Sequence, residues 1–86
     1  MIKVFDFYAD AGHGWCKVSK QLLNELNIAD KITHYSYQRN DYAYLEEDCD
    51  LSTFYNAYKD KYGIEPRFRE HVSDTSKIRY YNHYVK

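Results

Sequence analysis

Short runs of alternating or β-branched hydrophobic residues, separated by turn residues, divide the chain into five predicted strands. These strands span residues 2–8, 15–18, 32–37, 42–46 and 67–72. The first run carries apolar residues on both of its faces, which predicts a strand buried on both sides. The glycines of residues 10–14 predict a tight turn with positive φ, and residues 38–41 predict a second turn.

Two further stretches have apolar residues at helical spacing. The first covers residues 20–26, with Ser19 as its N-cap. Its apolar stripe consists of Leu22, Leu23, Leu26 and Ile28. The second covers residues 51–62, where Asp50 is expected to cap the helix and Gly63 to end it. Its predicted buried face consists of Leu51, Phe54, Tyr55, Tyr58 and Tyr62.

The order of these elements, ββαββαβ, predicts an α+β domain built as a two-layer sandwich. We expect a mostly antiparallel sheet of about five strands with both helices on one face. The chain has 86 residues, so residues 1–86 are predicted to form a single domain. The tail, residues 73–86, is polar and then aromatic, and its pattern leaves open a last strand or a short helix.

Composition supports a folded domain and excludes some partners. Hydrophobic residues make up 44% of the chain and aromatic residues 19%, whereas 3 Gly and 1 Pro are too few for a linker. A net charge of −1 excludes a strongly basic, non-specific nucleic-acid binder and a heavily acidic DNA mimic. Charge is still segregated: residues 40–52 hold five acids and no Lys or Arg, and residues 66–86 hold five bases against two acids. An acidic edge and a basic end are suited to orienting a partner.

The two cysteines, Cys16 and Cys49, are expected to be free and mostly buried thiols in a reducing cytoplasm. The charged N-terminal segment is typical of a strand and not of a signal peptide. No apolar run approaches the roughly 18 residues that a membrane span requires. The sequence therefore predicts a cytoplasmic protein that does not contact a membrane.

The first candidate motif is the turn at residues 10–15. His13 stands between two glycines, which would expose both ring nitrogens for metal binding or general base chemistry. Trp15 beside it would be an exposed binding anchor. The alternative is that His13 only faces solvent and Trp15 belongs to the core.

The second motif is the acidic run of residues 44–50. Glu46, Glu47, Asp48 and Asp50 are four carboxylates within five positions. They would suit a divalent cation or a paired acid and base, although the spacing matches no EF-hand loop. The alternative is a solvated helix entrance, in which the acids complement the helix dipole.

The third motif lies in the last predicted strand. Alternation places Arg67, Arg69 and His71 on one face. Together with Lys77 and Arg79, this face would suit a phosphate or a nucleic-acid backbone. The alternative is a solvated outer face of the sheet. The sequence contains no P-loop, GxSxG, HExxH or CxxC motif, and we predict neither a cofactor nor a bound metal.

Four stretches together resemble a family of small uncharacterised proteins encoded by bacteriophages, prophages and plasmids. They are residues 12–15 (GHGW), residues 26–32 with 35–37, and residues 44–50 (YLEEDCD). The resemblance covers roughly residues 10–79. It implies an accessory protein of a mobile element that binds a host or defence component, and it transfers no catalytic residue.

The leading hypothesis is therefore a small binding protein that occludes a host or defence-system protein. A second hypothesis is a metal- or ligand-binding enzyme that uses His13 and the acids of residues 46–50, and a third is a nucleic-acid-associated module. Strand direction leads us to expect His13 about one strand length from the acids, which favours binding over catalysis. The oligomeric state is left open. The candidate binding residues are His13, Trp15, Tyr37, Glu46, Glu47, Asp48, Arg67, Arg69 and His71.

Overall fold

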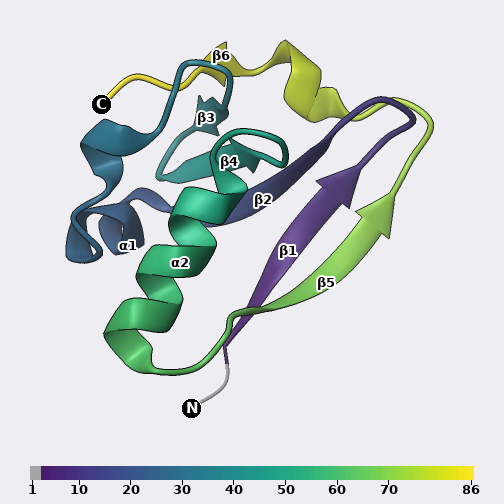
Figure 1. Cartoon of the computed structure of the whole chain (residues 1–86). Coiled ribbons are helices and arrows are strands. Elements are labelled where there is room, and N and C mark those ends of the chain that lie inside the picture. The colour runs from purple at the N-terminus through teal and green to yellow at the C-terminus, as the bar shows by residue number, and fades with distance from the viewer. Residues whose placement is uncertain (1–2) are drawn as a thin grey trace.

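A computed structural model describes residues 3–86 as one six-stranded sheet with two α-helices (Figure 1). In chain order the elements are β1 (Val4–Ala9), β2 (Gly14–Ser19), α1 (Lys20–Glu25), the 3-10 helix η1 (Ala29–Lys31), β3 (Tyr37–Arg39), β4 (Tyr42–Glu46), α2 (Leu51–Tyr62), β5 (Arg67–Val72), the 3-10 helix η2 (Lys77–Tyr80) and β6 (Asn82–His83). Ile2, where the first strand was predicted to begin, lies outside the described residues.

The strands are ordered β5-β1-β2-β4-β3-β6, and neighbours are antiparallel except for the parallel pair β1 and β5. The predicted α+β fold, with a mostly antiparallel sheet and two helices, is confirmed. The sheet has six strands where about five were expected, because the tail adds β6 at the edge formed by β3. The tail holds both structures left open by the sequence, a short helix and a short strand.

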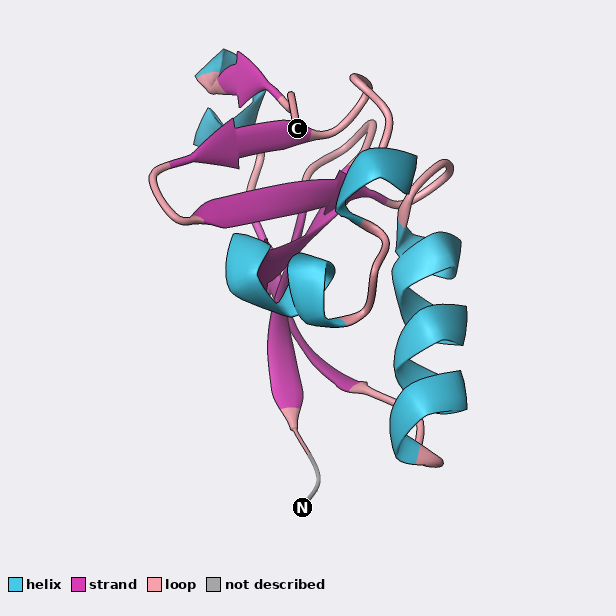
Figure 2. Ribbon diagram, turned by 90° about the vertical axis from the view of Figure 1, so that its left-hand side faces the viewer, coloured by secondary structure: helices cyan, strands magenta, loops and turns pink. Residues whose placement is uncertain are grey.

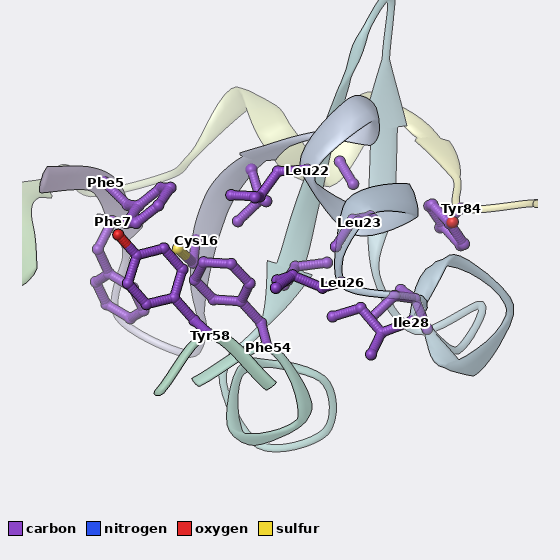
Figure 3. Packing of buried hydrophobic residues seen from close by; sticks show 14 residues of the cluster. Phe5, Phe7, Cys16, Leu22, Leu23, Leu26, Ile28, Phe54, Tyr58 and Tyr84 are labelled. Atoms are coloured by element: carbon purple, nitrogen blue, oxygen red, sulfur yellow. The ribbon is translucent and has the colours of Figure 1, made fainter. Parts of the chain in front are cut away.

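The main core lies between the sheet and the two helices (Figures 2 and 3). Phe5 of β1 meets Phe54 and Tyr58 of α2 edge to face, with ring centroids 5.0 and 5.6 Å apart. These are favourable geometries for aromatic pairs. The predicted buried face of α2 is therefore confirmed at Phe54 and Tyr58, whereas Tyr62 lies beyond the edge of the core and is exposed. The whole predicted stripe of the first helix, Leu22, Leu23, Leu26 and Ile28, is buried.

The helix ends agree with the sequence at two of three points. The Ser19 side chain accepts a hydrogen bond from the backbone N–H of Leu22, as expected of an N-cap. Gly63 ends α2 at φ 73°, in the left-handed region that favours glycine. Asp50 occupies the N-cap position of α2, but its side chain makes no capping hydrogen bond, so its predicted role is wrong.

Asp50 instead holds the segment before β3. Its carboxylate is buried and accepts hydrogen bonds from the backbone N–H and hydroxyl of Thr33 and from the hydroxyl of Ser36. Ser36 Oγ in turn accepts from the Glu46 N–H, and the Ser36 carbonyl accepts from the Tyr84 N–H. These contacts bend residues 32–36 into a turn, so the strand predicted over 32–37 is wrong and the ladder begins at Tyr37.

Two expectations for the first hairpin are corrected. One face of β1 is only partly covered, since Val4 is 49% exposed, so β1 is not buried on both sides. Among the described residues, only Asn27, Asn40 and Gly63 have a positive φ. The glycines of the first turn, Gly12 and Gly14, therefore do not adopt the left-handed backbone conformation that was predicted for them. Gly14 is required for space, because a Cβ there would lie 2.4 Å from the Phe7 ring.

The packing of α2 yields a stability prediction. Tyr58→Ala should lower the free energy of unfolding by about 3 kcal/mol, because it removes a buried ring from contact with Phe5 and Phe54. Tyr80→Ala, at an 82% exposed tyrosine, is the matched control and should change it by less than about 0.5 kcal/mol. Urea unfolding measures the free energy of unfolding of both variants. A change below about 0.5 kcal/mol for Tyr58→Ala, as for the control, would show that Tyr58 does not support the core.

Candidate functional site

The face of the sheet away from the two helices carries most of the candidate residues. Side chains directly opposite each other on paired strands point to the same face. Arg69 pairs with Asp6 and His71 with Tyr8, while Tyr8 also pairs with Trp15, and Trp15 with Glu46. The register therefore brings residues from all three sequence motifs onto one surface, which we call the outer face.

Asp10 organises the turn between β1 and β2. Its Oδ1 accepts hydrogen bonds from the N–H groups of Gly12 and His13, both at 3.0 Å. The same carboxylate accepts from the Ser76 N–H at 3.1 Å and binds Arg79 through Nε and Nη2. The Asp10 side chain is 1% exposed. The Arg79 guanidinium, followed by these backbone donors, holds the pKa of Asp10 well below its usual range.

The contact with Asp10 places the C-terminal segment against the hairpin, where both lie side by side in Figure 1. Arg79 then lies over the Trp15 ring, with its Cζ 5.5 Å from the ring centroid. Trp15, Tyr44 and Ile78 form a second buried cluster on the outer face. Trp15 is 2% exposed, so the prediction that it is an exposed anchor is wrong and its alternative role in the core is confirmed.

The Trp15 indole also carries an unpaired polar group. Its Nε1 is a buried side-chain nitrogen without a hydrogen-bond partner among residues 3–86. A buried donor left unpaired costs about 1–3 kcal/mol. The unpaired indole N–H of Trp15 therefore lowers the stability of the fold, although its ring packs in the cluster on the outer face.

His13 lies beside the first of the acids. Its Nδ1 is 3.7 Å from Oε1 of Glu46, and its side chain is 48% exposed. The expected separation of one strand length is wrong because β2 and β4 are neighbouring antiparallel strands. The end of β4 therefore meets the beginning of β2, where the Glu47 N–H donates to the Gly14 carbonyl.

The four acids separate into two environments. Glu46 is buried, and its carboxylate accepts a hydrogen bond from the Asp48 N–H. Glu47 and Asp48 are exposed at the surface. Asp50 points into the protein and supports the turn of residues 32–36. The predicted cluster of four acids is thus three acids near His13 and one structural carboxylate.

A pocket of about 320 Å³ opens where these segments meet. Its walls come from the first hairpin, from the segment entering β3, from the end of β4, and from the C-terminal segment. The lining residues are His13, Trp15, Tyr35, Tyr37, Glu46, Asp48, Cys49, Arg79 and His83. Tyr37 lies between two of the other rings, perpendicular to Trp15 at 6.1 Å and stacked on His83 at 4.9 Å.

Arg67, Arg69 and His71 lie on β5 at the far edge of the sheet and do not line the pocket. Arg69 and His71 both bind Asp6, at 2.9 Å. Hydrogen bonds from His71, and then from Arg69, lower the pKa of Asp6. Two of these three side chains are therefore already bound to a carboxylate within the sheet.

Several pocket residues were not predicted from the sequence. Tyr35, Cys49, Arg79 and His83 reach the pocket through tertiary contacts that no local pattern reports. Asp10, which organises the turn, did carry a local signal. An Asp two positions before a glycine in a turn is typical of a side chain that binds nearby backbone N–H groups.

Among residues 3–86, no group of three or more His, Cys, Asp or Glu side chains is placed to hold a metal ion. In the same range, no helix has the length and apolar character needed to cross a membrane. No family model matches the chain, and neither a curated protein nor a solved structure matches it. The resemblance to phage and plasmid proteins stays a prediction.

The cysteines differ in exposure, which corrects the expectation that both are mostly buried. Both are free thiols, Cys16 buried in the core and Cys49 exposed at the pocket. Burial raises the pKa of Cys16 to about 12. Partial desolvation, followed by the charges of Glu46, Asp50 and Asp48, raises the pKa of Cys49. A nucleophilic cysteine requires a lowered pKa, so Cys49 is poorly suited to covalent catalysis.

Thiol alkylation tests this assignment. With iodoacetamide at mildly alkaline pH, the folded protein should gain one adduct, at Cys49, and more slowly than a cysteine in the unfolded chain. In concentrated guanidinium chloride both cysteines should react without a reductant. Mass spectrometry counts and locates the adducts. Rapid labelling of Cys49 would contradict its raised pKa, and no labelling of the unfolded chain would reveal a disulfide.

The Asp10 contacts predict a specific acid response. Because its pKa is lowered in the folded state from an ordinary value of 3.8, the unfolded state takes up the proton first as pH falls. The stabilisation is thus complete above that ordinary value and is lost progressively below it. Asp10→Asn should flatten this acid dependence of the unfolding free energy, measured by urea titration at several pH values.

Asp60→Asn serves as the control, since Asp60 is exposed on α2 and makes no hydrogen bond or ion pair with other described side chains. It should keep the acid dependence of the wild-type protein. If Asp10→Asn did the same, the carboxylate would not hold the hairpin against the C-terminal segment.

Proposed function

We propose that the protein is a small binding protein that acts by occluding a protein partner through the surface around the pocket. One observation carries this proposal: four segments distant in sequence converge on a 320 Å³ hollow on a side of the sheet that α1 and α2 leave open. Concave sites with several aromatic rings and a few polar groups are typical binding sites. Tyr and Trp are also the residues most often responsible for binding energy at protein interfaces.

The identity of the partner rests on the resemblance alone. Because the chain resembles accessory proteins of phages and plasmids, we propose a host or defence-system protein as the target. Such a protein would work in the host cytoplasm and by steric exclusion. Charge supports protein over nucleic acid at this surface, since Glu46, Glu47 and Asp48 would repel phosphates there.

A second candidate function is supported by the pair of His13 and Glu46. A carboxylate 3.7 Å from an imidazole places two groups capable of proton transfer side by side. With the adjoining pocket, this pair would suit general acid–base catalysis on a small ligand. The one thiol in the pocket, Cys49, has a raised pKa, which disfavours covalent catalysis there.

Affinity purification from a bacterial host tests the leading proposal. Tagged wild-type protein should retain one partner in near-equal amount. The double variant Tyr37→Ala with Glu47→Lys should retain at least tenfold less, because it alters the rim of the pocket. Arg67→Glu, on the far edge strand, is the matched surface control and should retain the partner. Equal retention by all three proteins would contradict binding through the pocket.

His13→Gln separates the two functions. For occlusion, the loss of one rim contact should reduce affinity by about tenfold at most, with a proportionate loss of biological effect. For catalysis, the loss of a general base commonly costs at least about 100-fold in rate while binding persists. Affinity is measured by calorimetry with the captured partner, and the effect by the host phenotype. A lost phenotype with intact binding would establish catalysis.

A further inference from the structure

The pocket has an excess of negative charge over unpaired positive charge. Glu46 and Asp48 contribute two carboxylates to its lining. The one arginine, Arg79, is already neutralised by two hydrogen bonds to Asp10. A ligand with a positive charge would therefore gain Coulomb energy inside the pocket, whereas an anion would be repelled.

The aromatic walls suit the same kind of ligand. Trp15 and Tyr37 line the pocket with their rings inclined at 69°. Because Trp15 is buried beneath Arg79, Tyr37 offers the more accessible ring. Cations bind over the faces of Trp and Tyr rings, and perpendicular rings with nearby carboxylates are typical of cages for organic cations. The protein itself uses this preference at the pocket, since Arg79 lies over the Trp15 ring.

The size of the pocket suits a single side chain. A volume of about 320 Å³ accepts one long side chain but lies at the lower end of the range for drug-sized ligands. The pocket is open to the surface through the 48% exposed His13. A long, flexible basic side chain could therefore enter from a partner while its backbone remains outside.

We infer that the pocket binds a lysine or arginine side chain presented by the partner protein. This inference rests on the proposed function and names the chemistry of its central contact. The cationic head lies between Tyr37 and the carboxylates of Glu46 and Asp48, and its aliphatic stem covers the aromatic wall. The partner segment is accordingly basic, complementary to the acidic residues that surround the pocket entrance.

Blocked tripeptides test the inference without knowledge of the partner. The probes are acetyl-Gly-Arg-Gly-amide and acetyl-Gly-Lys-Gly-amide, compared with the norleucine and glutamate equivalents. The chain contains 1 Trp, so the indole N–H resonance of Trp15 reports on this pocket alone. Both basic peptides should shift that resonance and the amides of His13 and Tyr37. Their affinity should fall as salt is raised.

Charge-matched variants locate the binding. Glu46→Gln combined with Asp48→Asn should weaken the basic peptides at least tenfold. Asp60→Asn combined with Glu70→Gln removes the same charge far from the pocket and should leave the affinity within twofold. Circular dichroism establishes that both double variants are folded. Equal weakening in the two would show a diffuse electrostatic effect and overturn the inference.

The peptide experiment tests the basic side chain as the occupant of the pocket, and the partner experiment tests occlusion, so either proposal can fail without the other. Equal or tighter binding of the norleucine or glutamate peptide would overturn the basic side chain as the occupant, and so would the absence of any shift with the basic peptides. In either case partner capture that depends on Tyr37 would leave the occlusion proposal standing. A third outcome is that the basic peptides bind but the pocket variants still capture the partner. The cation site would then stand, and its role in occlusion would be rejected.

Discussion

The hydrogen bonds to the buried carboxylate of Asp50 are the interaction on which the walls of the pocket depend. A carboxylate removed from water is costly unless its oxygens receive hydrogen bonds. Thr33 and Ser36 supply them, and Ser36 extends the network to β4 through Glu46 and to the tail through Tyr84. Three walls of the pocket are fixed by this one network, which explains how a short chain maintains a concave surface without a disulfide.

The parts of the fold that could be predicted from the sequence are those fixed by local pattern. The predicted bounds of α2 and of β5 agree with the structure, because a helical aromatic face, a C-terminal glycine and a clear alternation each act over a few residues. The segment of residues 32–37 failed for the opposite reason. Its alternating residues favour a strand, but hydrogen bonds to Asp50 from 17 positions away bend it into a turn.

The candidate site shows the same division. The turn around His13 and the acidic run could each be recognised from the sequence, but their proximity depends on β4 pairing with β2. Arg79 and His83 could not be assigned to the site at all, because their positions follow from the contact of the tail with Asp10 and β3. The individual motifs could thus be recognised in the sequence, whereas their arrangement around one pocket depends on how the strands pair.

The long-range contacts also set the order in which the molecule can assemble. The β1–β2 hairpin and the helices form from nearby residues, whereas Arg69 meets Asp6 across 63 positions and Arg79 meets Asp10 across 69. Closing loops of this length is entropically expensive, and contacts of high sequence separation slow folding. We therefore expect the edge strand β5 and the tail to join the sheet after the local elements have formed. Because Arg79 and His83 of the tail line the pocket, binding competence would report that the tail has joined the sheet.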